Sequence, residues 1–204
     1  MSRRHPPLQD VVEGLPALGA RRSILLALQL ATELELAHQS GFRPGPIELR
    51  TVRVQRAGTP FEQAMFEPAT RKRLAPGEEQ RDTRALGLLF KQLALAKPMY
   101  LEGSMWSSAG GDAARALRRR ADEEVVIALC RALTLIADRC LGLRGTYEST
   151  FELVGDLAKL ARVASRIVAR RRALAPIVGL GSPRPRAQAH PIRLPKVIIN
   201  RVAA

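Results

Sequence analysis

The segment from Ser23 to about Ser40 constrains the fold most strongly, because a helix formed there is apolar on almost every side. Its large side chains leave only a narrow polar strip through Gln29 and Glu33. A helix of this kind is stable only when other elements cover it from several directions. We therefore expect a central helix with Ser23 as its N-cap, ended by Gly41, inside a larger helical domain.

Further helices are expected in the rest of the chain. Apolar periodicity predicts one that begins at Asp82 as N-cap and ends near Ala96. A basic helix over residues 112–120 is expected to lead into a long apolar helix over residues 122–141. The last helix, from Ser149 to about Arg172, has an apolar stripe opposite a basic stripe. The fold class is therefore mainly α.

Extended and irregular segments separate these helices. Residues 47–54 alternate between apolar and polar, which predicts a short strand or hairpin with one face covered. Residues 61–81 have no clean period and are expected to be irregular, and residues 8–15 predict one short helix. The expected division is a lead-in segment at 1–20, a helical domain at 21–174 and an extended basic, Pro- and Arg-rich tail at 175–204.

The positive charge is concentrated at the end of the chain. The net charge is +14, yet the residues before Leu157 carry only +3, because eleven basic residues and no acid follow that point. Of the 33 basic residues 28 are Arg, a bias that a high-GC genome produces without selection for function. The candidates for binding a polyanion or a partner are Lys159, Arg162, Arg166, Arg170, Arg171, Arg172, Arg184 and Arg186.

Several classes of protein are not expected. Cys130 and Cys140 lie ten residues apart in one predicted helix, so they cannot pair there and are expected to be free thiols, which suit a reducing compartment. The three histidines are too scattered for a metal site. The longest apolar run has eight residues, far short of the roughly 20 needed to span a bilayer, and no signal peptide is recognisable. We therefore expect a cytoplasmic protein.

Two segments of the chain follow a known pattern. Residues 37–54 begin with Ala37-His38 and align without a gap with the pattern A-H-x-x-G-I-V-H-R-D-L-K-P-E-N-I-L-L, and residues 82–100 contain Asp82 followed by Leu86-Gly87. In these residues the chain resembles the C-terminal lobe (C-lobe) of protein kinases, in particular of bacterial Ser/Thr kinases, and the second segment resembles the buried helix on which that lobe is built. The resemblance spans about residues 20–160 and implies a kinase C-lobe-like helical domain. It also implies that Asp82 is a structural anchor for the backbone of the catalytic loop.

The positions that carry the family's chemistry hold other residues. Pro46 stands where the family has its catalytic Asp, Glu48 where it has the loop Lys, and Thr51 where it has a metal-binding Asn. Phosphoryl transfer also needs a glycine-rich loop, a strand Lys and a D-F-G motif, and none is found around the first helix or after Val54. We expect no N-lobe. The resemblance therefore implies a truncated, pseudokinase-like protein without catalysis, cofactor or metal.

Two functions follow as expectations. The first is a non-catalytic scaffold or regulatory module that binds another protein, since core positions are kept while catalytic ones are lost. The alternative is binding of RNA, DNA or another polyanion through the basic last helix and tail. An enzyme of unfamiliar type, or a remnant without function, remains a third reading. A small-molecule substrate is not expected.

Overall fold

The computed structural model describes residues 5–14, 18–59, 61–67, 72–96 and 112–174. These residues form five helices and four short strands, so the prediction of a mainly α fold with a short hairpin is confirmed. The helices are α1 (Leu8–Glu13), α2 (Ala20–Gln39), α3 (Glu78–Leu95), α4 (Asp112–Cys140) and α5 (Thr150–Leu174). The strands are β1 (Phe42–Arg43), β2 (Val52–Gln55), β3 (Gln63–Phe66) and β4 (Lys72–Arg73).

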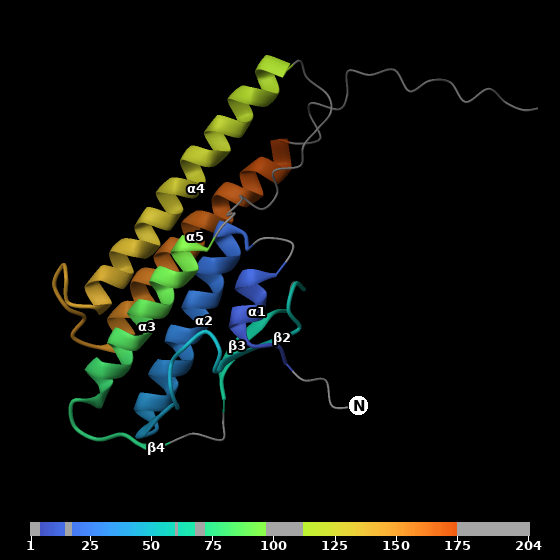
Figure 1. Ribbon diagram of the computed structural model, residues 1–204. Helices are drawn as coiled ribbons and strands as arrows, with labels where there is room; N and C mark the ends of the chain where they lie inside the picture. Colours follow the sequence, from blue (N-terminus) through green and yellow to red (C-terminus); the bar gives the residue numbers. More distant parts are fainter. Residues whose placement is uncertain (1–4, 15–17, 60, 68–71, 97–111, 175–204) are drawn as a thin grey trace, which may run out of the picture.

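Helix α2 is the central element, as predicted. It packs against α3, α5 and β3, so it is covered from several sides (Figure 1). Its start differs from the prediction: the N-cap is Gly19, and Ser23 lies inside the first turn, where its hydroxyl donates to the Gly19 carbonyl oxygen at 3.2 Å. The side chains of α2 that are at most 1% exposed are Ala20, Ser23, Ile24, Leu26, Ala27, Leu30, Ala31 and Leu34.

The polar strip of α2 holds a strand in place. The side-chain amide of Gln29 donates to the Glu62 carbonyl oxygen at 2.9 Å and accepts from the Ala64 N–H at 2.8 Å. The Glu33 carboxylate accepts from the Phe66 N–H at 2.7 Å. These bonds satisfy backbone groups of β3, and of Glu62 just before it, that the other neighbour of β3, strand β2, does not reach. The polar strip of α2 therefore holds the β2–β3 hairpin against the helix.

The strands form two antiparallel pairs. In the first pair, Val52 of β2 lies opposite Phe66 of β3, and in the second β1 pairs with β4. The strand predicted over residues 47–54 is wrong in its first half, because the N–H groups of Thr51 and Val52 bond to the Glu48 carbonyl oxygen and form a turn. The prediction of an irregular segment at 61–81 is also wrong, since this segment contains β3, β4 and the start of α3.

Helix α3 begins at Glu78, four residues before the predicted start. Its N-cap is Gly77, whose φ of 80° lies in the left-handed region that glycine adopts without strain. Asp82, predicted to be the N-cap, lies inside the helix and is 1% exposed. The cap prediction fails because the Asp82 carboxylate points into the domain, toward His38 and Arg43.

Helix α4 is a single helix of 29 residues, where a basic helix followed by a separate apolar one was predicted. Cys130 and Cys140 both lie on α4, and neither forms a disulfide. Helices α4 and α5 pack antiparallel, because Arg139 near the end of α4 pairs with Asp156 near the start of α5, while Arg171 near the end of α5 pairs with Asp122.

Residues before α2 contribute to the core. Leu8 is 0% exposed and Leu18 is 2% exposed. The Val54 N–H donates to the Pro6 carbonyl oxygen at 2.9 Å, so this segment is bonded to β2. The predicted tail at 175–204 lies outside the described residues. Among the residues described, no helix combines the length and the apolar character needed to cross a membrane.

Candidate functional site

A buried polar cluster joins three helices. His38 of α2 lies between α3 and α5, with Nε2 at 3.3 Å from Asp82 Oδ2 and Nδ1 at 3.1 Å from the hydroxyl of Thr150. The side chains of His38 and Asp82 are only 4% and 1% exposed. Polar groups at this depth are stable only when they are hydrogen-bonded, and the three side chains satisfy one another. The cluster holds the C-terminal end of α2 and the first residue of α5 against the first half of α3.

Arg43 connects this cluster to the surface. Its guanidinium donates to Asp82 Oδ1 and to Glu78 Oε1, each at 2.5 Å. Burial disfavours the charged guanidinium, but the attraction of the two carboxylates is stronger, so the pKa of Arg43 is raised. The pKa of Glu78 is lowered, chiefly because its carboxylate accepts a hydrogen bond from the Ala75 N–H, and to a smaller extent because of its contact with Arg43. Asp82 therefore anchors the segment after α2 through the Arg43 side chain.

Pro46, Glu48 and Thr51, the three positions selected by the resemblance, lie in one turn. The Thr51 hydroxyl lies 2.5 Å from the Pro46 carbonyl oxygen, and it accepts from the Glu48 N–H at 3.1 Å. The Glu48 carboxylate accepts from Arg50 Nε at 2.5 Å. The polar groups of Glu48 and Thr51 are thus bonded within the turn, and Pro46 has no side-chain donor or acceptor. This arrangement offers no pair of carboxylates for holding a metal and positioning a nucleophile.

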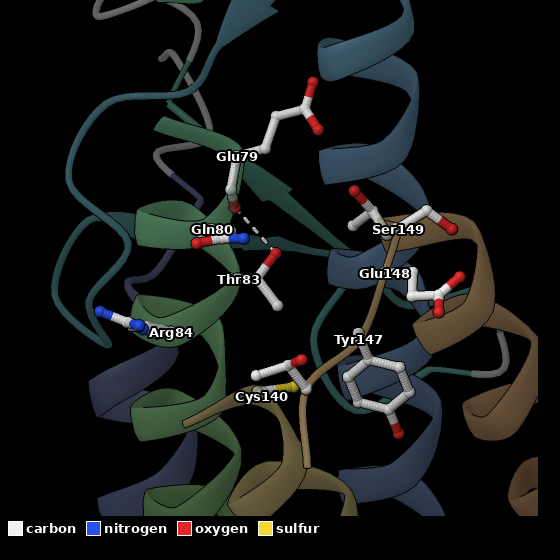
Figure 2. A pocket seen from close by; sticks show the side chains of 10 residues that line it. Glu79, Gln80, Thr83, Arg84, Cys140, Tyr147, Glu148 and Ser149 are labelled. Carbon is white, nitrogen blue, oxygen red and sulfur yellow. Dashed lines mark hydrogen bonds between the residues drawn. The ribbon is translucent and has the colours of Figure 1, made fainter. Parts of the chain in front are cut away.

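A small pocket lies beside the polar cluster, between α3 and the segment that joins α4 to α5. Figure 2 shows its lining, with the Thr83 hydroxyl donating to the Glu79 carbonyl oxygen. The volume is about 40 Å³, enough for very few water molecules. Burial raises the pKa of the Cys140 thiol at its wall to about 12 and also raises that of Tyr147. A reactive cysteine has a lowered pKa, so Cys140 is a packing residue.

The predicted basic residues of α5 separate into two groups. Lys159 pairs with Asp156 at 2.9 Å, and Arg171 pairs with Asp122. Arg162, Arg166 and Arg170 are exposed, and none of them forms an ion pair with a described residue. The side chain of Arg172, together with Arg184 and Arg186, lies outside what the structure describes.

An open groove between α2, β1 and β3 was not predicted from the sequence. Its volume is about 170 Å³, and two large apolar side chains on its walls are exposed, Leu36 to 57% and Phe42 to 43%. The sequence did contain one indication of this groove, because Leu36 places a large apolar side chain on the polar side of α2. The groove is lined by Glu33, Leu36, Ala37, Ser40, Phe42, Pro44, Phe66 and Glu67.

Within the described part of the chain, no three His, Cys, Asp or Glu side chains gather so that they could hold a metal ion. One hydroxyl on the wall of the pocket in Figure 2 is paired with a base, because Thr150 Oγ1 lies 3.1 Å from His38 Nδ1, but Thr150 is only 5% exposed. The hydroxyl of Thr51 is bonded within the closed turn at residues 46–51. The chain matches no known protein-family model, and no curated protein is significantly similar to it.

Proposed function

We propose that this protein is a non-catalytic, kinase-like module that binds another protein. The observation that carries the proposal is the turn at residues 46–51, where the positions of kinase chemistry bond to each other instead of facing a substrate. Loss of chemistry with retention of the surrounding helices is the result expected when the shape of a domain is still used.

The buried contact between His38 and Asp82 supports the kinase-like origin. These residues lie 44 positions apart, in the two segments that resemble the family, and their side chains meet inside the domain. Chance matches in an unrelated helical protein give no reason for such a contact. The anchor differs from the family's pattern, since Asp82 pairs with two side chains, those of His38 and Arg43.

The groove between α2, β1 and β3 is the surface we propose for the partner. Leu36 and Phe42 offer apolar area that a partner side chain can cover. The carboxylates of Glu33 and Glu67 lie beside them, and each already has a partner, the Phe66 N–H and Arg53 respectively. The groove therefore suits an extended protein segment that places an apolar residue on Leu36 and Phe42. Covering one large apolar side chain contributes about 1.5–3 kcal/mol.

The partner proposal predicts a strong effect of Leu36→Lys. A photo-crosslinking amino acid at position 36 identifies the partner in cells, and the purified pair is then titrated. We expect Leu36→Lys to weaken binding about tenfold or more, since 1.4 kcal/mol corresponds to a factor of ten. The matched control is Leu88→Lys, because Leu88 of α3 is also 57% exposed. If both variants bind like the parent protein, the groove is not the interface.

The absence of kinase chemistry predicts no response to nucleotide. We expect the midpoint of thermal unfolding to stay unchanged when ATP and magnesium are added in millimolar amounts, because a ligand stabilises only a folded state that binds it. Differential scanning fluorimetry measures this midpoint. A clear rise that requires both ATP and magnesium would contradict the interpretation of Pro46 and Thr51.

A further inference from the structure

Three arginines of α5 form one row along the helix, which we call the arginine row. Arg162, Arg166 and Arg170 follow each other at intervals of four residues, and all three are exposed. Four residues advance a helix by about 6 Å and turn it by a little more than one full turn, so the row is about 12 Å long on one side of α5. A fourth cation lies beside it, because Arg21 of α2 donates to Ser165 at 3.2 Å.

The charge of this row is not neutralised within the described residues. Apart from Arg172, whose side chain is not described, each of the other cations of α5 meets an acid: Lys159 meets Asp156, and Arg171 meets Asp122. No Asp or Glu follows Asp156 in the chain. Asp122 is already paired with Arg171, and the neighbouring Glu124 lies 3.7 Å from Arg120. Lys159 and Arg171 are therefore paired within the protein, whereas the side chains of the arginine row are exposed and can contact a ligand.

A solvated helix face explains only part of this arrangement. Cations in the last turn of a helix interact favourably with the helix dipole, which accounts for Arg170 and Arg171. The dipole effect fades within one turn, so it does not account for Arg162 and Arg166. Composition bias supplies arginines, but it does not arrange them in a row that lacks acidic partners.

We propose that the arginine row binds the phosphate backbone of a nucleic-acid duplex without reading its sequence. Each strand of a duplex carries one phosphate per about 3.4 Å of axis, so a row of about 12 Å spans three to four phosphates. Residues 152–204 contain no Phe, Trp or Tyr, and proteins that bind single strands use such aromatic residues for stacking. A duplex, whose phosphates are held in a regular line, fits a rigid helix better.

This surface is separate from the groove. The contact between Arg21 and Ser165 places the arginine row near the start of α2, whereas Leu36 and Ser40 place the groove at its end. The inference therefore does not rest on the proposed partner protein. Duplex binding and partner binding can each fail without the other.

The test is the salt dependence of binding to a 20-base-pair duplex, made once of DNA and once of RNA. The full-length protein is titrated at several salt concentrations between 50 and 200 mM, as is the variant Arg162→Gln/Arg166→Gln/Arg170→Gln. Losing three phosphate contacts should reduce the slope of log K against log salt by about 2.7, because each contact contributes about 0.9. The control is Arg56→Gln/Arg84→Gln/Arg131→Gln, which removes the same charge from exposed positions elsewhere.

Three results would overturn the proposal. The first is that the parent protein binds neither duplex at 50 mM salt. The second is that the slope of log K against log salt falls as much in the control variant as in the row variant, since binding would then depend on net charge alone. The third is that the row variant keeps its duplex affinity but no longer binds vesicles containing phosphatidylserine, which would assign the row to a membrane surface. Circular dichroism of both variants checks that α5 is folded.

Discussion

Replacing Asp82 by alanine is expected to lower the free energy of unfolding by about 3 kcal/mol. Removing one partner of a buried ion pair costs about 3–5 kcal/mol, because the charge that remains is left without compensation. The lower end applies here, since the Arg43 side chain is 16% exposed and keeps its contact with Glu78. His38 also loses the acceptor at its Nε2. Urea denaturation monitored by circular dichroism measures this loss.

A neighbouring acid serves as the matched control. Glu79 lies in the first turn of α3 and is exposed. It carries one negative charge, as Asp82 does. Glu79→Ala should cost about 0.5 kcal/mol, the contribution of an acid near a helix start. If Asp82→Ala is no more destabilising than Glu79→Ala, the polar cluster does not hold α2, α3 and α5 together.

A double substitution separates the charge from the packing. Arg43→Met removes the cation that loses one of its two acids in Asp82→Ala, so the double variant should be more stable than the sum of the two single losses predicts. Residues in direct contact give coupling energies of about 0.5–3 kcal/mol in such cycles. A coupling near zero would show that Asp82 stabilises the domain through its packing alone.

The helices were predictable from the sequence because their signal is local. Apolar periodicity located α2, α3 and α5 to within four residues, and the apolar character of α2 indicated its central position. Both N-caps were nevertheless placed wrongly. Ser23 and Asp82 are good cap residues by type, but Ser23 bonds back to Gly19 and Asp82 has partners 39 and 44 positions away. Local rules carry no information about such partners.

The short strands depend on contacts between distant residues. Strand β3 has no apolar alternation of its own, and its backbone is held by β2 on one side and by Gln29 and Glu33 on the other. Its sequence therefore resembles an irregular segment. The same applies to β4, two exposed residues whose strand geometry comes from pairing with β1.

The candidate site was predictable only in part. The resemblance selected Pro46, Glu48 and Thr51, and it selected Asp82, but it did not indicate that Arg43 would pair with that acid. The sequence analysis named all the cations of α5 alike, although the pair of Lys159 and Asp156 is local and could have been expected from helical spacing. The pair of Arg171 and Asp122 joins two helices and could not. Leu36 was a signal for the groove in the sequence, but the position of Phe42 beside it depends on the tertiary structure.

Replacing Gly87 by alanine should lower the free energy of unfolding by about 2 kcal/mol. A methyl group at this position of α3 would lie 2.6 Å from the Cβ of Cys140 and 3.0 Å from the Ala137 carbonyl oxygen. A Cβ and a carbonyl oxygen are both fixed to the backbone of α4, so the two helices must separate to make room. Overpacking of this kind costs about 1–3 kcal/mol. Thermal unfolding should shift downward by several degrees.

Gly155→Ala is the opposite case and the control. Gly155 lies in α5, and no atom lies within 4 Å of the place where its methyl group would be. Alanine there should stabilise the protein by about 0.5–1 kcal/mol, because glycine loses more backbone entropy than alanine when a helix forms. The two substitutions are chemically identical and should have opposite signs. If Gly87→Ala stabilises the protein as well, the close approach of α3 and α4 is not required, and Gly87 is only a poor helix former.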